Sequence, residues 1–170
     1  MSWMRIAVLA YVVAVALLVW HGWSQLPDLP EQVASHFDAS GRPDAWSSRD
    51  DYARTTWLLN GFLIVLFAGL AAGLNRLPAG LINIPNRSWW LAPQRADTTR
   101  AEIAAWVLGL GAWMFLFLLF LEDRIVRVNR GEMATTEHLW PGLGVFLAGT
   151  AVWTALLLRR YLRRPPTPGA

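Results

Sequence analysis

The hydrophobic positions of this chain fall into four long runs, which are separated by stretches rich in polar residues. Each run approaches the roughly 20 apolar residues that a helix needs to cross the ~30 Å hydrocarbon core of a bilayer. None contains Asp, Glu, Lys or Arg, and none shows the polar stripe of a soluble surface helix. The pattern predicts an all-α integral membrane protein with four transmembrane helices, at Ile6–Trp23, Thr56–Leu74, Ile103–Leu121 and Leu139–Leu158.

The connections between these runs complete the expected domain plan. We expect one membrane domain over residues 1–164 and a short disordered tail over 165–170. The connection at 24–55 is much longer than the two to eight residues that usually join helices in a bundle, so it needs structure of its own. The first and third connections, 24–55 and 122–138, emerge on one side of the membrane and are expected to form a small outer cap; the second, 75–102, lies on the other side.

Composition supports a membrane protein and excludes several kinds of site. The chain is 55% hydrophobic, above the 45–50% of ordinary soluble domains, and all 15 of its basic residues are arginine. It has no cysteine, which excludes disulfides, thiolate metal sites and a cysteine nucleophile. The net charge is only +3 and the arginines are scattered, so we expect no nucleic-acid partner.

The arginines also predict an orientation. An even number of spans places both termini on one side, and nine arginines lie on that side or in the second connection, against six in the first and third connections. Because positively charged residues near spans favour the cytoplasm, we expect both termini to be cytoplasmic. Tryptophans would then mark the outer interface at Trp20, Trp23, Trp57 and Trp140, and the inner one at Trp3, Trp89, Trp90 and Trp106.

Small and polar residues inside the spans predict where helices pack. Gly69 and Gly73 form a small-xxx-small pair in the second run, and Gly144 and Ala148 form another in the fourth. Such pairs let helix backbones approach closely in lipid, although glycine is also simply common in membrane helices. Asn60 is the clearest polar group within a span, where it can hydrogen-bond across helices or reach water near the outer end of its helix.

The first connection contains the most specific polar pattern of the chain. Val33–Phe37 alternates in the way of a short strand, and Asp38–Gly41 has the acceptor and the glycine of a tight turn. Arg42–Asp44 then suggests a second turn, and Trp46 suggests an anchor on the membrane surface or in a small cluster. We therefore expect a folded loop.

Three interpretations of this loop's chemistry stay open. In a structural one, His36 bonds the loop backbone and Asp44 accepts amides in the turn after Pro43. In a metal-binding one, His36 and His138 join nearby carboxylates to hold zinc or copper, but no two histidines have helical i,i+4 spacing and HExxH is absent. In a catalytic one, His36 and Asp44 form an acid–base pair, but no serine elbow, phosphate loop or carboxylate dyad accompanies it. We expect no metal, no cofactor and no catalytic residue.

The other two connections carry weaker patterns. The second contains tandem tryptophans between two arginines and is expected to lie at the lipid interface. In the third, Ile125–Val128 alternates apolar and charged residues before a turn at Asn129–Gly131, which predicts a small hairpin packed on the first connection. The expected lipid-interface residues are Arg87, Trp89, Trp90 and Arg95.

Residues 29–46, LPEQVASHFDASGRPDAW, resemble the signature of a bacterial membrane-protein family that includes the Sdp immunity proteins. The family pattern is roughly LPxxIPxHFxxxGxPDxW, and Ala34 departs from it where relatives usually have proline. The segment INIPNRSWWLAPQR, at 82–95, is also similar to a stretch in this group. The matching positions in the first segment are Leu29, Pro30, His36, Phe37, Gly41, Pro43, Asp44 and Trp46.

The resemblance implies a bacterial cytoplasmic-membrane protein and a possible role in immunity or signalling. In the Sdp system, the immunity protein protects its host from a secreted toxin and sequesters a repressor at the membrane; its extra spans have no counterpart here. We expect a non-enzymatic protein that binds a peptide, toxin or envelope partner through its outer loop. The alternatives are an accessory subunit of a transporter or enzyme complex, and a metal- or ligand-handling protein; membrane lipids and an oligomer or larger complex are further expected contacts. The outer-loop residues of this prediction are His36, Phe37, Asp38, Gly41, Pro43, Asp44 and Trp46.

Overall fold

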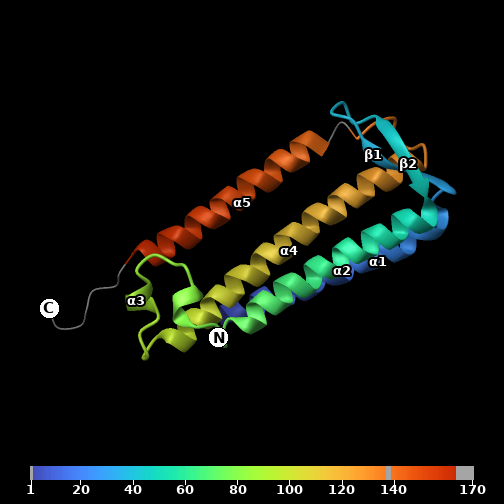
Figure 1. Ribbon diagram of the computed structural model, residues 1–170. Helices are drawn as coiled ribbons and strands as arrows, with labels where there is room; N and C mark the ends of the chain where they lie inside the picture. The colour runs from blue at the N-terminus through green and yellow to red at the C-terminus, as the bar shows by residue number, and fades with distance from the viewer. Residues whose placement is uncertain (1, 137–138, 164–170) are drawn as a thin grey trace.

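The computed structural model describes residues 2–136 and 139–163, and it contains four long helices (Figure 1). All four are long and apolar enough to cross a membrane, which confirms the predicted fold class. The short segments between them are η1 (Leu26–Asp28), η2 (Ala79–Leu81) and α3 (Arg87–Trp90). The long helices are α1 (Ser2–Gln25), α2 (Arg49–Gly73), α4 (Ala96–Asn129) and α5 (Leu139–Leu162), and the strands are β1 (Gln32–Phe37) and β2 (Pro43–Ser48).

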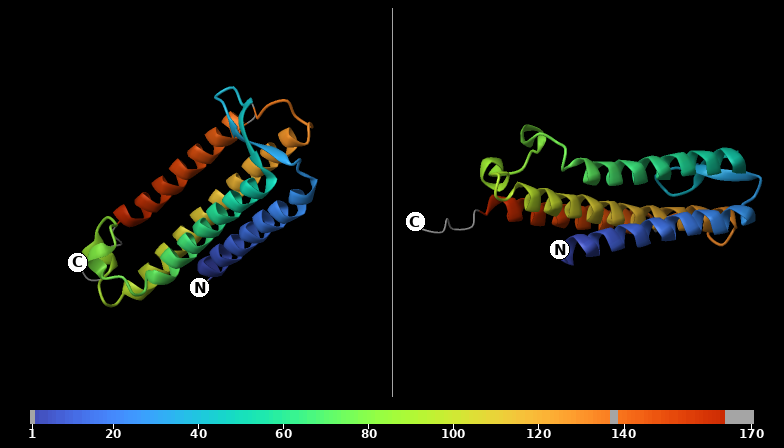
Figure 2. Two further views of the ribbon diagram at one scale, coloured as in Figure 1. Left: turned by 45° about the vertical axis from the view of Figure 1, so that its right-hand side comes forward. Right: turned by 90° about the horizontal axis from the view of Figure 1, so that it is seen from below.

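Helix α4 lies at the centre of the arrangement and contacts each of the other three long helices (Figures 1 and 2). The right-hand view of Figure 2 shows α1 and α2 on opposite sides of α4. Their contact with α4 is organised by Phe115, a buried ring that meets Tyr11 of α1 and Phe67 of α2 edge-on at centroid distances of 5.5 and 6.0 Å. Tyr11 also donates a 2.6 Å hydrogen bond to the carbonyl oxygen of Ile64, so α1 and α2 are joined as well.

Glycines of α4 and α5 create the space for large rings at their contact. A Cβ atom at Gly109 would lie 2.6 Å from the Trp153 ring, and one at Gly149 would lie 2.7 Å from the Trp113 ring. A tryptophan of each helix therefore packs against a glycine of the other helix, where no side chain is in the way. In lipid, where apolar burial gives little net drive for association, this close fit is the main source of attraction between helices.

The small residues singled out from sequence lie elsewhere. Apart from chain neighbours and the backbone of the same helix, no described atom lies within 4 Å of a Cβ built at Gly69, Gly73 or Gly144. Ala148 is exposed on α5. The three glycines do not bring two described helices of this chain together, so the close helix approach expected at them is not seen within it.

The second connection is tied to the last turn of α5 and to the first turn of α4, and one of its tryptophans is buried. Trp90 donates a 2.9 Å hydrogen bond to the carbonyl oxygen of Tyr161, and Asn86, held at φ 53°, donates to the carbonyl oxygens of Tyr161 and Leu162 at 3.1 Å each. These bonds satisfy carbonyls that the end of a helix leaves without intrahelical partners. Thr99 of α4 donates to the carbonyl of Trp90 at 2.8 Å, which completes the link.

The four residues predicted to lie at the lipid interface have contacts within the protein. Trp90 is buried in protein, so the prediction that it lies at the lipid interface is wrong. The Arg95 guanidinium lies 3.9 Å from the Trp89 ring centroid, and Arg87 donates to the carbonyl of Gly80 at 2.9 Å. Lipid contact by Arg87, Trp89 and Arg95 stays a prediction.

The third connection differs from its predicted form, because α4 continues through it to Asn129. The expected hairpin at Ile125–Val128 is therefore wrong. The turn at residues 129–131 is real, but it ends a helix: Gly131 has φ 73°, its N–H donates to the Val128 carbonyl, and the Glu132 N–H donates to the Arg127 carbonyl. This is the Schellman arrangement, in which glycine takes the left-handed conformation just beyond a helix.

The crowding around Gly111 yields a stability prediction. A Cβ at Gly111 would lie 2.9 Å from both Phe67 and Tyr11, whereas a Cβ at Gly69 meets nothing within 4 Å. We expect Gly111→Ala to lower the free energy of unfolding by about 1–3 kcal/mol through overpacking. Gly69→Ala, the same change in a neighbouring span, should be neutral or stabilising by up to about 1 kcal/mol. Thermal and denaturant unfolding in detergent measures both, and equal effects would contradict the described packing.

Candidate binding site at the capped end of the helices

The first connection folds into a two-stranded antiparallel hairpin of β1 and β2, joined by a tight turn. The Asp38 carboxylate accepts hydrogen bonds from the Ser40 N–H at 2.8 Å, the Ser40 hydroxyl at 2.7 Å and the Arg42 N–H at 2.9 Å. The Ser40 hydroxyl, followed by the Arg42 amide, lowers the pKa of Asp38 below its ordinary value. Gly41 takes φ 77° to close the turn. The predicted strand at Val33–Phe37 and the turn after it are confirmed, while β2 was not foreseen.

The hairpin is held against the end of α4 from below. Val33 and Leu29 are buried against Val126 of α4. The Asn129 side chain clamps the backbone of Ala34, accepting from its N–H at 2.7 Å and donating to its carbonyl at 3.1 Å. A proline at residue 34 would have no N–H and could not make the first of these bonds. The alanine at this position therefore lets Asn129 bond both the N–H and the carbonyl of one residue.

The third connection closes over the turn of the hairpin, as the sequence predicted for the two outer loops. The buried Thr136 donates its N–H to the Gly41 carbonyl at 2.8 Å. Trp140, at the start of α5, donates its indole N–H to the Ala39 carbonyl at 2.9 Å. First and third connections thus form one cap, fixed by main-chain carbonyls of the turn (Figure 1).

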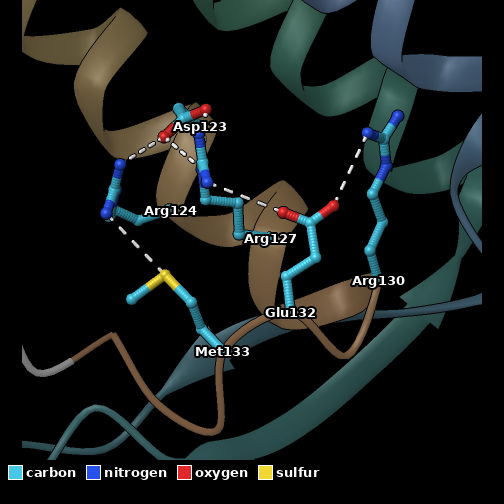
Figure 3. Close-up of polar contacts among 6 residues, drawn as sticks. All are labelled: Asp123, Arg124, Arg127, Arg130, Glu132 and Met133. Atoms are coloured by element: carbon cyan, nitrogen blue, oxygen red, sulfur yellow. Dashed lines mark hydrogen bonds and ion pairs between the residues drawn. The ribbon is translucent and has the colours of Figure 1, made fainter.

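An arginine–carboxylate network surrounds the last turns of α4 beneath the cap (Figure 3). Asp123 pairs with Arg124 at 2.6 Å and with Arg127 at 3.0 Å, and Glu132 approaches both Arg127 and Arg130. Arg130 also pairs with Asp28, beyond α1, at 2.7 Å. Such partly exposed pairs each contribute little to stability, at most about 1 kcal/mol, so their main effect is to orient the chain around the end of α4.

The predicted outer-loop residues divide into supporting and outward-facing groups. Phe37, Asp38, Gly41 and Pro43 build the turn and its flanks. His36 and Asp44 pair across the strands at 2.5 Å between Nδ1 and Oδ1, with side chains 70% and 45% exposed. The expectation that Asp44 accepts amides in a turn is wrong, because it lies within β2 and faces the His36 ring.

Trp46 completes the outward-facing group. It lies in β2 opposite Ala34 and is 58% exposed, although it is one of the largest apolar side chains of the cap. Within residues 2–136 and 139–163, no three His, Asp or Glu side chains gather in a way that could hold a metal ion. His138, the second predicted metal-binding candidate, lies outside the described residues.

A buried polar pair lies below the hairpin, and sequence reasoning found only half of it. Asn60 of α2 donates its side-chain N–H to Oε1 of Glu122 on α4 at 2.7 Å, and the two residues are only 3% and 7% exposed. Asn60 therefore bonds across helices as predicted. Glu122 lies one residue past the predicted third span. Its spacing with Val126 and Asn129, at i, i+4 and i+7, is the signal that places all three on one helical face.

Two cavities adjoin Glu122. The larger, of about 390 Å³, lies between α2 and α4 beneath the hairpin, and the smaller, of about 20 Å³, lies toward α1 and includes His21 and Trp57. Concave, mostly apolar spaces with a few convergent polar groups are the usual form of ligand sites. A buried ionisable side chain in a membrane helix is also a recurrent mark of a functional site. We call the larger space, from Ser35 and Ser47 at its rim to Asn60 and Glu122 at its floor, the subhairpin cleft.

The clamp of Asn129 on Ala34 can be tested by hydrogen exchange. We expect Asn129→Ala to leave the buried Ala34 amide and carbonyl without partners, which costs about 1–3 kcal/mol locally, and to speed amide exchange over residues 32–48. The control is Asn83→Ala, which removes an exposed asparagine from the second connection. Unchanged exchange in β1 after the Asn129 substitution would show that the clamp does not hold the hairpin.

The Asn60–Glu122 pair predicts strong non-additivity. Asn60→Leu alone leaves a buried carboxylate without its donor and should lower the free energy of unfolding by about 1–3 kcal/mol. Adding Glu122→Met removes the carboxyl group that has lost its partner, so the double variant should recover most of that loss. A double-mutant cycle measured by unfolding in detergent gives the coupling, and additive effects would mean that the two side chains act independently.

Comparison with known proteins identifies only part of this chain. No curated protein and no solved structure match it. Residues 7–59 match the model of a family described as a domain of unknown function (DUF1648). The matched segment begins in α1, contains the whole hairpin and ends in α2, one residue before Asn60. The chain is thus a multi-pass membrane protein whose first span, hairpin and beginning of α2 are similar to this uncharacterised family.

Proposed function

We propose that this protein is a non-enzymatic membrane receptor that binds a peptide segment of a secreted or envelope partner through its hairpin cap. The observation that carries the proposal is the outward display of Trp46 and the His36–Asp44 pair on a hairpin that is fixed from two sides. Their exposure gives these three side chains little part in the packing of the chain itself.

The rigidity of the hairpin favours binding. Asn129 holds β1 from below and Thr136 holds the turn from above, so little conformational entropy is lost when a partner docks. Exposed tryptophan supplies the large, nearly rigid contact area that dominates many protein interfaces, and the flanking histidine and aspartate supply hydrogen bonds. This combination suits a peptide or protein surface better than a small polar metabolite.

The arrangement of charge supports an outward-facing cap. The termini and second connection carry the larger share of arginines, so the positive-inside rule puts them in the cytoplasm and the hairpin outside. The resemblance of residues 29–46 to the Sdp immunity family is consistent with a role in immunity or signalling in a bacterial cytoplasmic membrane. On this proposal the partner approaches from the extracytoplasmic side.

Photo-crosslinking in intact cells tests the proposal. A photo-reactive amino acid in place of Trp46 should give one discrete adduct, because a specific partner rests on the exposed face of β2. The control places the same amino acid at Leu81, which is 70% exposed, more than Trp46, and lies at the opposite end of the molecule. The adduct at residue 46 should be lost when His36 and Asp44 are both changed to alanine. A diffuse smear at both positions, with normal insertion, would overturn the proposal.

An accessory-subunit role has a separate observation in its favour. Gly69 and Gly144 are exposed on α2 and α5, where a second membrane protein can approach the backbone closely. Copurification of a defined larger complex in mild detergent, lost on Gly69→Leu, would favour this second function.

A further inference from the structure

We propose that the subhairpin cleft is a binding site for a lysine side chain of the peptide that docks on the hairpin. The inference deepens the proposed function and rests on it for the identity of the partner. It names a second contact, below the hairpin, and the chemistry that this contact recognises.

The charge of the cleft selects a cation. Its lining holds the carboxyl groups of Glu122 and Asp51 and no arginine. Asp51 already pairs with Arg54 just outside the lining, so Glu122 is the carboxyl group of the cleft without a cation. Glu122 has only the neutral Asn60 amide as its hydrogen-bond donor, and no arginine pairs with it among the described residues. A buried carboxylate is stabilised most by a hydrogen-bonded positive charge, so an entering ammonium group would meet a site lacking its counter-charge.

The neutral polar groups of the cleft suit the three donors of an ammonium. The Ser47 hydroxyl is buried at the rim without a hydrogen-bond partner in the described chain. Asn60 donates to Glu122 through its nitrogen, which leaves its side-chain oxygen as an acceptor. Thr55 and Thr56 add hydroxyl oxygens along α2. The planar fork of arginine needs paired acceptors in one plane, whereas the compact ammonium of lysine accepts this dispersed set.

The walls of the cleft fit the rest of a lysine side chain. They are apolar, and the four methylene groups of lysine pack well along such surfaces while the charged end reaches a polar group. The rim residues Ser35 and Ser47 belong to β1 and β2, so the cleft is continuous with the hairpin that displays Trp46. A single peptide segment can therefore contact the hairpin and place a side chain beneath it. The wall residues are Leu59, Leu118, Leu121 and Ile125.

The experiment uses the full chain in phosphatidylcholine nanodiscs, with calorimetric titration of two peptides. The probes are acetyl-Leu-Lys-Leu-amide and its counterpart with norleucine, which keeps an aliphatic chain but lacks the ammonium. We expect saturable binding of the lysyl peptide, and binding at least about tenfold weaker for the norleucyl peptide and for Glu122→Gln. Glu31→Gln is the matched control, because it removes an exposed carboxylate at the same end of the molecule and should bind as the wild type does.

A second variant keeps the test decisive if Glu122→Gln does not fold. Leu59→Trp adds bulk to the cleft from the exposed side of α2 and keeps both Asn60 and Glu122 in the chain. It should also weaken binding of the lysyl peptide. Equal affinity for the two peptides, or unchanged affinity in both variants, would overturn the inference. Phosphatidylethanolamine that copurifies with the wild type and not with Glu122→Gln, without peptide binding, would overturn it too, since the occupant would then be a lipid amine.

The crosslinking experiment at residue 46 separates this inference from the proposed function. An adduct that forms equally well in Glu122→Gln protein would leave hairpin binding intact and show that the cleft has no part in it. Absence of the adduct from the wild-type protein would overturn the proposed function itself, whatever the calorimetry shows.

Discussion

The structure depends on the length of one helix. With 34 residues, α4 is about 51 Å long, well beyond the ~30 Å that the hydrocarbon core requires. Its apolar part packs against the other three spans. Its last turns carry Glu122, Val126 and Asn129 on one face toward the hairpin. Helix packing in the membrane and the position of the hairpin outside it are therefore set by the same rigid element.

That continuity explains how a hairpin of only two short strands has a defined place. An isolated two-stranded hairpin is marginally stable in water. Here Val33 and Leu29 are buried against α4, Ala34 is hydrogen-bonded to it, and β2 passes into α2 without an intervening residue. Ser48 ends the strand and caps the helix by accepting from the Asp51 N–H at 3.1 Å. The cap thus extends the helical scaffold, which is the form of support that a binding surface needs.

The sequence-based prediction succeeded where residues close together in the sequence determine the structure. Four apolar runs are sufficient for four spans, and Asp38 with Gly41 is sufficient for a turn. It failed where a short pattern has two meanings: residues 125–128 alternate like a strand yet continue a helix, and Pro43–Asp44 reads as a turn yet begins β2. Glycine spacing shows which residues allow close approach, but the tryptophans that use Gly109 and Gly149 come from another helix. The burial of Glu122 likewise depends on α2 and the hairpin, so no local pattern reveals it fully.

The hydrogen bonds between the second connection and the end of α5 determine which substitutions and insertions in α5 the structure tolerates. Trp90 and Asn86 bond to main-chain oxygens of α5, and every residue type has such an oxygen. These hydrogen bonds therefore fix the position of the end of α5, independently of the side chains at residues 161 and 162. Substitutions along the outer face of α5 leave these hydrogen bonds intact. A single inserted residue would instead rotate the rest of the helix by about 100° relative to the residues that form them. The outer face of the fourth span is thus free to change in composition while the length of the span is held constant.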